Sequence, residues 1–229
     1  MIGDESKRNR RERQGAFAEV DLYPVTGAAQ SAGRSTLAVV EAVVAAGCRM
    51  VQLREKELEK REYYHLARRV RQLTEARGVL MICNDHVDVA LAVGADGVHL
   101  GQQDLPINAA RRLAPELLLG ASTHDMQEAL AAQRAGADYV NIGPIFPTRT
   151  KEGAAGFLGP EEVERIGTCL EVPFTVMGGI TLDNIEQLLS RGARRVAVVS
   201  AVTAAPDVEA AARALRERIR AFRRRDTTV

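Results

Sequence analysis

The sequence predicts an α/β fold, a single-domain (β/α)₈ TIM barrel. Short apolar segments of strand length alternate with helical segments along most of the 229 residues, eight such strand segments occur, and no linker divides them. Strict alternation predicts parallel strands joined by helical crossovers. Eight units in this length favour a closed barrel. An open doubly wound sheet is the alternative, although no GxGxxG motif follows the first strand.

The expected strands are short runs rich in Val, Ile and Leu, which is typical of parallel strands buried on both faces. In chain order they cover residues 21–26, 49–54, 79–83, 97–100, 117–121, 139–143, 173–177 and 195–200.

Helices are expected between the strands, where Ala, Leu and Val recur at three- and four-residue spacing. The clearest are residues 35–46, 61–77, 124–135 and 207–223. The segments AVGADGV, RAGADYV and SRGARRV each carry a glycine that can end a helix immediately before a strand.

Residues 1–19 are expected to form a charged, disordered leader before a barrel over residues 20–229. The leader is basic but lacks the apolar stretch of a signal peptide. No apolar run approaches the ~20 residues that a membrane-spanning helix needs. The three cysteines, Cys48, Cys83 and Cys169, have no CxxC spacing, so reduced thiols and a cytoplasmic location are expected.

The composition argues against nucleic-acid and membrane partners. The formal net charge is only +1, aromatic residues make up 4 %, and there is no tryptophan. Neither a basic field nor an aromatic stacking surface is therefore indicated. Small-molecule substrates are expected, and the sequence leaves open whether the chain forms a homo-oligomer.

Polar residues gather where the expected strands end, which is where TIM barrels carry their chemistry. Alternation along the second strand sends Gln52, Arg54 and Lys56 to one side. Asp85 and Asp104 follow neighbouring strands and could share one Mg²⁺ with phosphate oxygens. This group of residues suits a diphosphate.

A second anion site is expected after the seventh and eighth strands. Gly178-Gly179 and Ser200 occupy the turns that often hold a phosphate monoester in these barrels. Two anion sites facing one cavity suggest that two substrates are joined. No nucleophile–base pair is evident, and His99 is expected to be a packed, hydrogen-bonded residue of the barrel interior.

The segment NIGPIFPTRTKEGAAG, residues 141–156, combines prolines and glycines with hydroxyl and cationic side chains. We expect residues 144–157 to form a lid, in which Pro144 and Pro147 stiffen the root and Gly153 and Gly156 allow closure over bound substrates.

Seven motifs resemble, in sequence and order, those of the thiamine phosphate synthase family: QLREK at 52–56, ND at 84–85, GVHLGQQDLP at 97–106, GASTH at 120–124, GPIFPTRTK at 143–151, GGI at 178–180 and VVSAV at 198–202. The resemblance covers about residues 21–210. It implies a Mg²⁺-assisted transferase that couples hydroxymethylpyrimidine diphosphate to hydroxyethylthiazole phosphate, giving thiamine phosphate and pyrophosphate.

By matching position, the resemblance also implies site residues. The pyrimidine diphosphate would meet Gln52, Leu53, Arg54, Glu55, Lys56, Asn84, Ser122 and Lys151, with Arg54, Lys56, Ser122 and Lys151 acting in catalysis. The metal would lie on Asp85 and Asp104. The thiazole phosphate would meet Thr148, Arg149, Thr150, Gly179, Val199 and Ser200.

One departure and three alternatives stay open. Gly27 stands where many members of the family carry an acidic residue, so its segment receives no role. A related thiazole tautomerase would use the phosphate site alone. A phosphate-binding barrel isomerase would need an acid–base pair. A non-catalytic binder of thiamine precursors would show no turnover.

Overall fold

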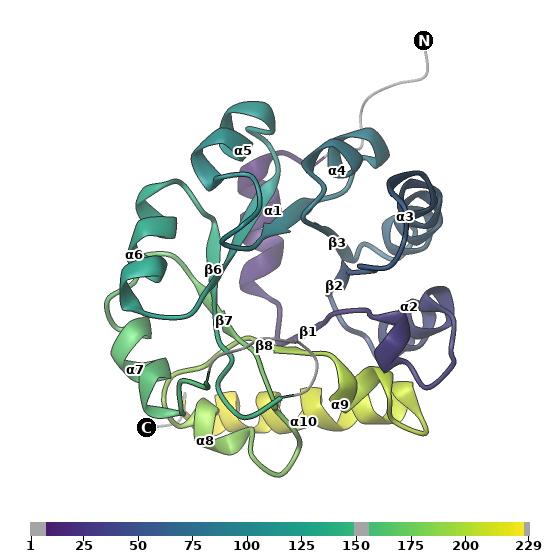
Figure 1. The fold of residues 1–229 in the computed structure, drawn as a ribbon. Helices are drawn as coiled ribbons and strands as arrows, with labels where there is room; N and C mark the ends of the chain where they lie inside the picture. Colours follow the sequence, from purple (N-terminus) through teal and green to yellow (C-terminus); the bar gives the residue numbers. More distant parts are fainter. Residues whose placement is uncertain (1–7, 149–155, 227–229) are drawn as a thin grey trace.

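The computed structural model describes residues 8–148 and 156–226 and shows the barrel that the sequence predicts (Figure 1). Over these residues, eight strands run parallel in the order β1-β8-β7-β6-β5-β4-β3-β2. Their bounds are β1 Leu22–Pro24, β2 Met50–Leu53, β3 Leu80–Asn84, β4 Gly97–Leu100, β5 Leu118–Thr123, β6 Tyr139–Ile142, β7 Phe174–Val176 and β8 Val196–Val198. Each lies within a few residues of its predicted range.

The first and last strands of the sheet, β1 and β2, meet, although few backbone hydrogen bonds join them. An isolated parallel bridge joins Val25 to Gln52, and the amide of Thr26 donates to the carbonyl of Gln52 at 2.9 Å. These contacts link β1 to β2 and nearly close the barrel. The carboxyl ends of all eight strands therefore surround one space.

The helices form an outer ring around the strands (Figure 1). After the N-terminal helix, they are α2 Thr36–Ala45, α3 Lys60–Glu75, α4 Val87–Val93, α5 Ile107–Leu113, α6 Met126–Arg134, α7 Glu161–Gly167, α8 Glu186–Leu189, α9 Ser200–Thr203 and α10 Val208–Asp226, with a 3₁₀ turn η1 at Ala28–Gln30. The crossovers make every neighbouring strand pair parallel.

Alternation along the strands divides the buried apolar residues between two cores. The larger core lies between the strands and the helices and contains Val51 and Leu53 of β2. The smaller core fills the barrel interior and contains Met50 of the same strand with Tyr23 and Tyr139. Residues two apart on a strand share a face, so Gln52 follows Met50 into the interior.

The N-terminal segment corrects the prediction of a disordered leader for part of its length. Residues Arg10–Ala18 form the helix α1, which lies behind the centre of the barrel in the view of Figure 1. A capping box formed by Asn9 and Glu12 starts the helix. Phe17 is buried in the interior core and stacks on Tyr139, with 4.6 Å between ring centroids.

Charged contacts also fix α1 to the amino-terminal end of the barrel. The Nε atom of Arg10 lies 2.8 Å from the carboxylate of Asp138, and Arg13 donates to the carbonyl of Glu116 at 2.6 Å. Because basic residues dominate the segment, composition alone suggested a solvated tail. The acceptors at this end of the barrel, which include the buried Asp138 carboxylate, give those charges a structural role.

Shortening Phe17 to leucine should lower the free energy of unfolding by roughly 1 kcal/mol, because the substitution removes the stack on Tyr139 and the contact with the Arg195 guanidinium 5.0 Å from the ring. Urea unfolding measures the change. Phe157→Leu is the matched control, since Phe157 is 58 % exposed. Equal losses in the two variants would contradict a stabilising role for the stack of Phe17 on Tyr139.

Candidate active site

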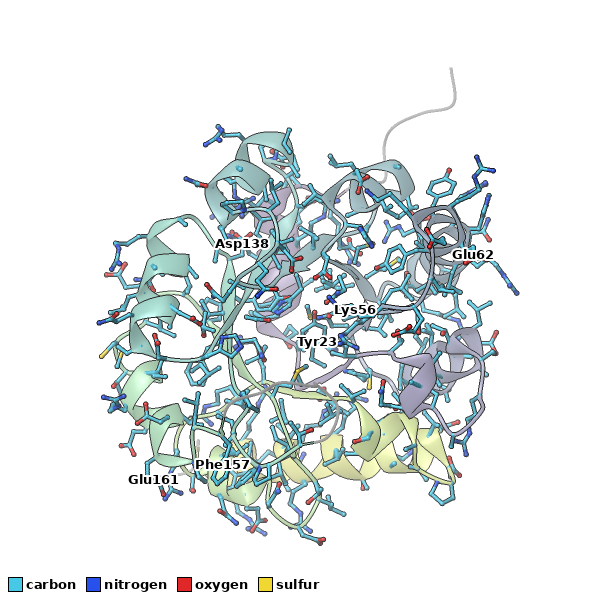
Figure 2. All side chains as sticks on the ribbon, viewed as in Figure 1. Tyr23, Lys56, Glu62, Asp138, Phe157 and Glu161 are labelled. Atoms are coloured by element: carbon cyan, nitrogen blue, oxygen red, sulfur yellow. The ribbon has the colours of Figure 1, made fainter. Side chains whose placement is uncertain are left out.

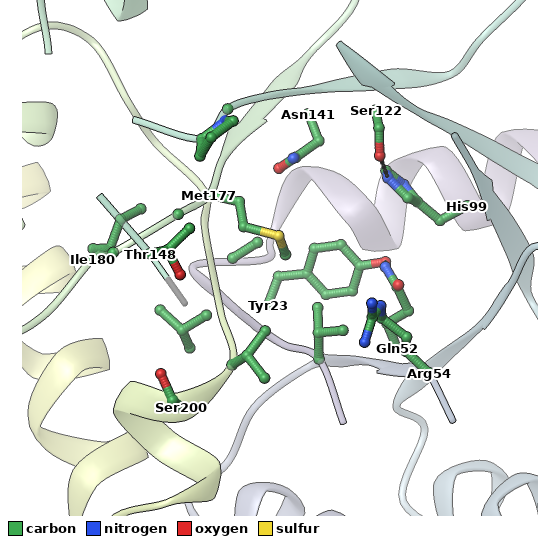
Figure 3. Close-up of a pocket in the computed structure, with 18 of the residues that line it drawn as sticks. Tyr23, Gln52, Arg54, His99, Ser122, Asn141, Thr148, Met177, Ile180 and Ser200 are labelled. Carbon is green, nitrogen blue, oxygen red and sulfur yellow. Dashed lines mark hydrogen bonds between the residues drawn. The ribbon is translucent and has the colours of Figure 1, made fainter. Parts of the chain in front are cut away.

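A cavity of about 650 Å³ opens at the carboxyl ends of the strands (Figure 3). All eight strands, or the residues immediately after them, contribute to its lining. Tyr23 and Lys56 lie inside the ring of helices, whereas Glu62 and Glu161 lie at its periphery (Figure 2). The cavity therefore occupies the position at which (β/α)₈ barrels place their active sites.

The structure brings most of the predicted site residues to this one cavity. The lining includes Gln52, Arg54, Lys56, Asn84, Asp85, Asp104, Ser122, Thr148, Gly179, Val199 and Ser200. They come from segments spread over about 150 residues of the chain, and only barrel closure makes them neighbours.

Two residues of the QLREK motif have side chains that do not line the cavity. Leu53 packs in the core between strands and helices. Glu55 is buried and accepts hydrogen bonds from the Ala28 amide at 2.8 Å and the Thr36 hydroxyl at 2.6 Å. Strand alternation explains both positions, since they point opposite to Gln52, Arg54 and Lys56.

The central part of the expected lid, including Arg149, Thr150 and Lys151, lies outside the described residues. The root that precedes it is tied to the loop after β7. Ile145 donates to the carbonyl of Met177 at 2.9 Å, and Phe146 donates to that of Gly178 at 3.0 Å. Thr148, the last described residue of the root, lines the cavity.

The two aspartates meet beside a lysine. The Nζ atom of Lys56 lies 2.5 Å from the Asp85 carboxylate, and Asp104 is near enough to Asp85 to raise its pKa. Burial raises the pKa of Asp85, Lys56 lowers it, and the neighbouring Asp104 raises it again. The balance is a raised pKa, so Lys56 does not fully offset burial and the second carboxylate.

The backbone holds these carboxylates in an unusual way. Asp85 has φ = +62°, which non-glycine residues seldom adopt but which Asp and Asn tolerate better than most. Asp104 accepts a hydrogen bond from the Gly101 amide at 2.7 Å. Oxygen ligands of this kind suit a hard cation that keeps several waters or substrate oxygens. Within residues 8–148 and 156–226, no group of three or more His, Cys, Asp or Glu side chains could hold a metal.

Arg54 supplies a cation with no carboxylate partner. It lines the cavity, and its guanidinium forms no salt bridge within the described part of the chain. Its backbone amide is held by the Thr26 hydroxyl at 3.0 Å. A guanidinium that faces a cavity without an internal counter-ion is available to an anionic ligand.

The glycines after β7 allow two loops to pack closely. Gly178 and Gly179 have φ values of +105° and +63°. A Cβ atom on Gly179 would lie 2.5 Å from the carbonyl oxygen of Pro147. The predicted tight turn is therefore present, and it brings the root of the 143–148 segment to the cavity, near Ser200 at the start of α9.

Several cavity residues were not identified from the sequence. Tyr23, Gln30, Asn141 and Met177 all contribute to the lining. Asn141 is buried and accepts a hydrogen bond from the Thr175 hydroxyl at 2.7 Å. Its signal in the sequence was a polar residue inside an apolar strand, two positions after Tyr139, on the interior face.

Gly27 leaves room for one of these residues. A Cβ atom at Gly27 would lie 2.4 Å from the side-chain oxygen of Gln30 and 3.9 Å from Val199. The amide of Gln30 therefore occupies the space in which a longer side chain at position 27 would begin.

Two of the four histidines, His99 and His124, line the cavity in different environments. His99 is buried and bonded to Tyr139 and Ser122, which confirms the expectation of a packed interior histidine. His124 also lines the cavity, and its Nδ1 atom lies 2.8 Å from the Glu128 carboxylate. This His–Glu pair was missed from the sequence, although its four-residue spacing within the predicted 124–135 helix was a local signal for it.

A search of the helices over the described residues finds none that is both long and apolar enough to cross a membrane.

Comparison with known proteins gives consistent matches. The family described as "Thiamine monophosphate synthase" matches residues 22–202. The chain is 50 % identical over 195 residues to a thiamine-phosphate synthase of Chloroflexus aurantiacus, covering 85 % of this chain and 90 % of that protein. It is 42 % identical over 208 residues to one of Pelotomaculum thermopropionicum, covering 90 % and 95 %.

Solved structures agree with the fold. A thiamine phosphate pyrophosphorylase from Pyrococcus furiosus superposes with a TM-score of 0.83 at 37 % identity, covering 89 % of this chain and 96 % of that one. A 3-hexulose-6-phosphate synthase superposes with a TM-score of 0.65 at 18 % identity and shares the fold alone.

Proposed function

The chain belongs to the thiamine monophosphate synthase family, and from that premise we propose how its cavity joins hydroxymethylpyrimidine diphosphate to hydroxyethylthiazole phosphate. Membership at this identity and coverage makes the chain a transferase that forms thiamine phosphate. One observation carries the residue assignment. Arg54, which has no salt bridge to any residue that the structure describes, and the Lys56–Asp85–Asp104 group line the same cavity as Thr148, Gly179 and Ser200.

The diphosphate is assigned to the side of the cavity formed by β2 and β3. Arg54 and Lys56 provide positive charge, and Asn84 and Ser122 provide neutral donors. Lys151, outside the described residues, is assigned here from the family motif. A guanidinium can bind two phosphate oxygens at once, which also fixes the orientation of the leaving group.

Mg²⁺ is assigned to Asp85 and Asp104. The fit rests on their chemistry, because two adjacent carboxylates and a raised pKa at Asp85 mark a place where a cation would relieve repulsion. Two carboxylates with substrate oxygens match the ligand set that Mg²⁺ takes in phosphate sites. A bound Mg²⁺ would supply positive charge to the diphosphate.

The thiazole phosphate is assigned to the opposite side of the cavity. Figure 3 shows Thr148 and Ser200 on one side and Gln52 and Arg54 on the other. Backbone amides around Gly179, Val199 and Ser200 can approach a phosphate closely, because glycine adds no side chain and Ser200 begins a helix. Arg149 and Thr150 are assigned to the same phosphate from the family motif alone.

The proposed reaction needs no side-chain nucleophile. The bond between the pyrimidine methylene carbon and the diphosphate oxygen breaks, and pyrophosphate leaves with the electron pair. The pyrimidine amino group stabilises the methylene cation. The thiazole ring nitrogen then donates its lone pair to that carbon, giving the thiazolium of thiamine phosphate. The protein stabilises the charge of the leaving group and holds the two rings in contact.

The function is tested by mixing the purified protein with both phosphorylated heterocycles and Mg²⁺. Thiamine phosphate should form, as measured by mass, with one pyrophosphate released for each product. Omission of either heterocycle should abolish coupling. Absence of the coupled product would refute the proposal.

The His124–Glu128 pair favours one second candidate, a thiazole tautomerase, because that reaction needs a general acid and base at the cavity. A tautomerase releases no pyrophosphate. Its activity would appear as conversion of the thiazole substrate alone, without the pyrimidine diphosphate.

A further inference from the structure

Five hydrogen-bonded polar side chains cross the barrel interior at the floor of the cavity, and four of them, Gln52, Tyr23, His99 and Ser122, are labelled in Figure 3. Gln52 Nε2 lies 2.7 Å from the Tyr23 hydroxyl, which lies 3.1 Å from the Tyr139 hydroxyl. Tyr139 lies 3.2 Å from His99 Nδ1, and His99 Nε2 lies 3.0 Å from the Ser122 hydroxyl. The chain thus connects Gln52 on β2 with Ser122 on β5, and both of its ends line the cavity.

The middle of this chain is closely packed. Tyr23 and Tyr139 are 1 % or less exposed. A Cβ atom on Gly120 would lie 2.2 Å from Tyr139 Cζ and 2.5 Å from His99 Nδ1, so the glycine leaves the space that the two side chains fill. Phe17 of α1 also stacks on Tyr139. The rings have little freedom to reorient, and the hydrogen bonds are shielded from water.

Counting the available protons indicates which group donates in each of these hydrogen bonds. The Gln52 amide donates to Tyr23, which leaves the single proton of Tyr23 available to donate to Tyr139. Tyr139 in turn donates to His99 Nδ1, which leaves the His99 proton on Nε2 to be donated to Ser122. Burial raises the pKa of both tyrosines, so they keep their protons.

The direction decides what each end offers to a ligand. Gln52 turns its NH₂ group to Tyr23, to which one N–H donates, and presents its carbonyl oxygen as an acceptor. Ser122 accepts from His99 and presents its hydroxyl proton as a donor. If the chain ran the other way, Gln52 would present a donor, and the Ser122 proton would be used on His99.

We propose that Tyr23, Tyr139 and His99 are positioning residues that fix Gln52 as an acceptor and Ser122 as a donor for the pyrimidine substrate. This inference rests on the proposed function. An aminopyrimidine carrying a diphosphate offers an amino group that suits the acceptor, and ring-nitrogen or phosphate oxygen atoms that suit the donor. A heterocycle with a carbonyl oxygen in place of the amino group would face a second acceptor and bind poorly.

The tautomer of His99 tests the direction without reference to activity. Nitrogen-15 NMR of the histidine-labelled full chain should show a neutral His99 protonated at Nε2, with the resonance assigned by its loss in His99→Gln. A His99 protonated at Nδ1 would reverse the direction of the hydrogen bonds between Gln52 and Ser122 and would overturn the proposal.

Tyr139→Phe tests the consequence, because it removes one hydroxyl from the middle of the chain and keeps the ring. We expect kcat/KM for the pyrimidine diphosphate to fall tenfold or more, KM for the thiazole phosphate to change less than twofold, and His99 to populate both tautomers. The matched control is Thr74→Val, which removes a buried hydroxyl bonded to the Arg71 carbonyl, away from the cavity. It should leave both kinetic values unchanged.

The possible failures can be distinguished. If the wild-type chain makes no thiamine phosphate, the proposed function fails. If the wild type is active and Tyr139→Phe matches Thr74→Val in kinetics, the positioning role fails while the function stands. Equal loss of kcat/KM for both substrates would show general damage to the barrel and would also overturn the specific role.

Discussion

Arg54→Ala is expected to lower kcat for thiamine phosphate formation about 100-fold, with little change in melting temperature. One well-placed charge on a developing anion in a shielded site is commonly worth ~3 kcal/mol, which corresponds to this factor. Stability should hold because the guanidinium has no salt bridge within the described residues. Steady-state release of pyrophosphate and a thermal melt measure the two quantities.

Arg54→Lys separates charge from geometry. Lysine restores a positive charge but cannot bind two oxygens in the planar arrangement of a guanidinium, so only part of the lost rate should return. Arg112→Ala, on α5 of the outer ring, is the control and should leave kcat within twofold. A loss below threefold in Arg54→Ala would remove Arg54 from the leaving-group site.

The strands and their order along the chain could be predicted because each is a short apolar run between helical segments. The same alternation correctly predicted that Gln52, Arg54 and Lys56 share one side of β2, and the structure shows all three at the cavity. Local pattern was sufficient here, since the period of two is a property of the strand itself.

Features that depend on distant contacts could not be predicted from local pattern. The helix α1 carries a capping box in its sequence, but its burial requires Tyr139 and Asp138, more than 100 residues away. The chain from Gln52 to Ser122 likewise joins strands that are not neighbours in the sheet. In both cases the contacting residues are distant in the sequence and become neighbours only when the barrel closes.

The arrangement of Asp85 and Asp104 could be predicted from the sequence only in part. The sequence placed Asp85 and Asp104 after neighbouring strands, and barrel geometry predicted their proximity. It did not predict the positive φ of Asp85 or the close approach of Lys56. The structure nonetheless shows Asp85 in the lining of the cavity, where the metal assignment needs it.

Asp85→Asn should lower the activity but keep or raise the melting temperature. Asparagine keeps the size of the side chain and tolerates φ = +62°, but it removes one of the two proposed metal-binding carboxylates. We expect the Mg²⁺ concentration for half-maximal activity to rise at least tenfold and kcat/KM to fall about 100-fold. A Mg²⁺ titration of pyrophosphate release measures both.

The melting temperature of the same variant should stay constant or rise. The pKa of Asp85 is raised in the folded protein, so above that pKa the ionised carboxylate lowers the free energy of unfolding relative to a neutral group. Replacing it with an amide removes that penalty, and the lost contact with the half-exposed Lys56 is worth little. A function-bearing charge is expected to show this opposition between activity and stability.

Asp88→Asn is the matched control, because Asp88 lies three residues after Asp85 and also pairs with a lysine, Lys60. Its pKa is lowered by Lys60 despite partial burial, so its charge favours the folded state above the ordinary aspartate pKa. This variant should keep the wild-type Mg²⁺ titration and lose a little stability. An unchanged titration in Asp85→Asn would exclude Asp85 as a metal ligand, and a fall in its melting temperature larger than that of Asp88→Asn would make its role structural.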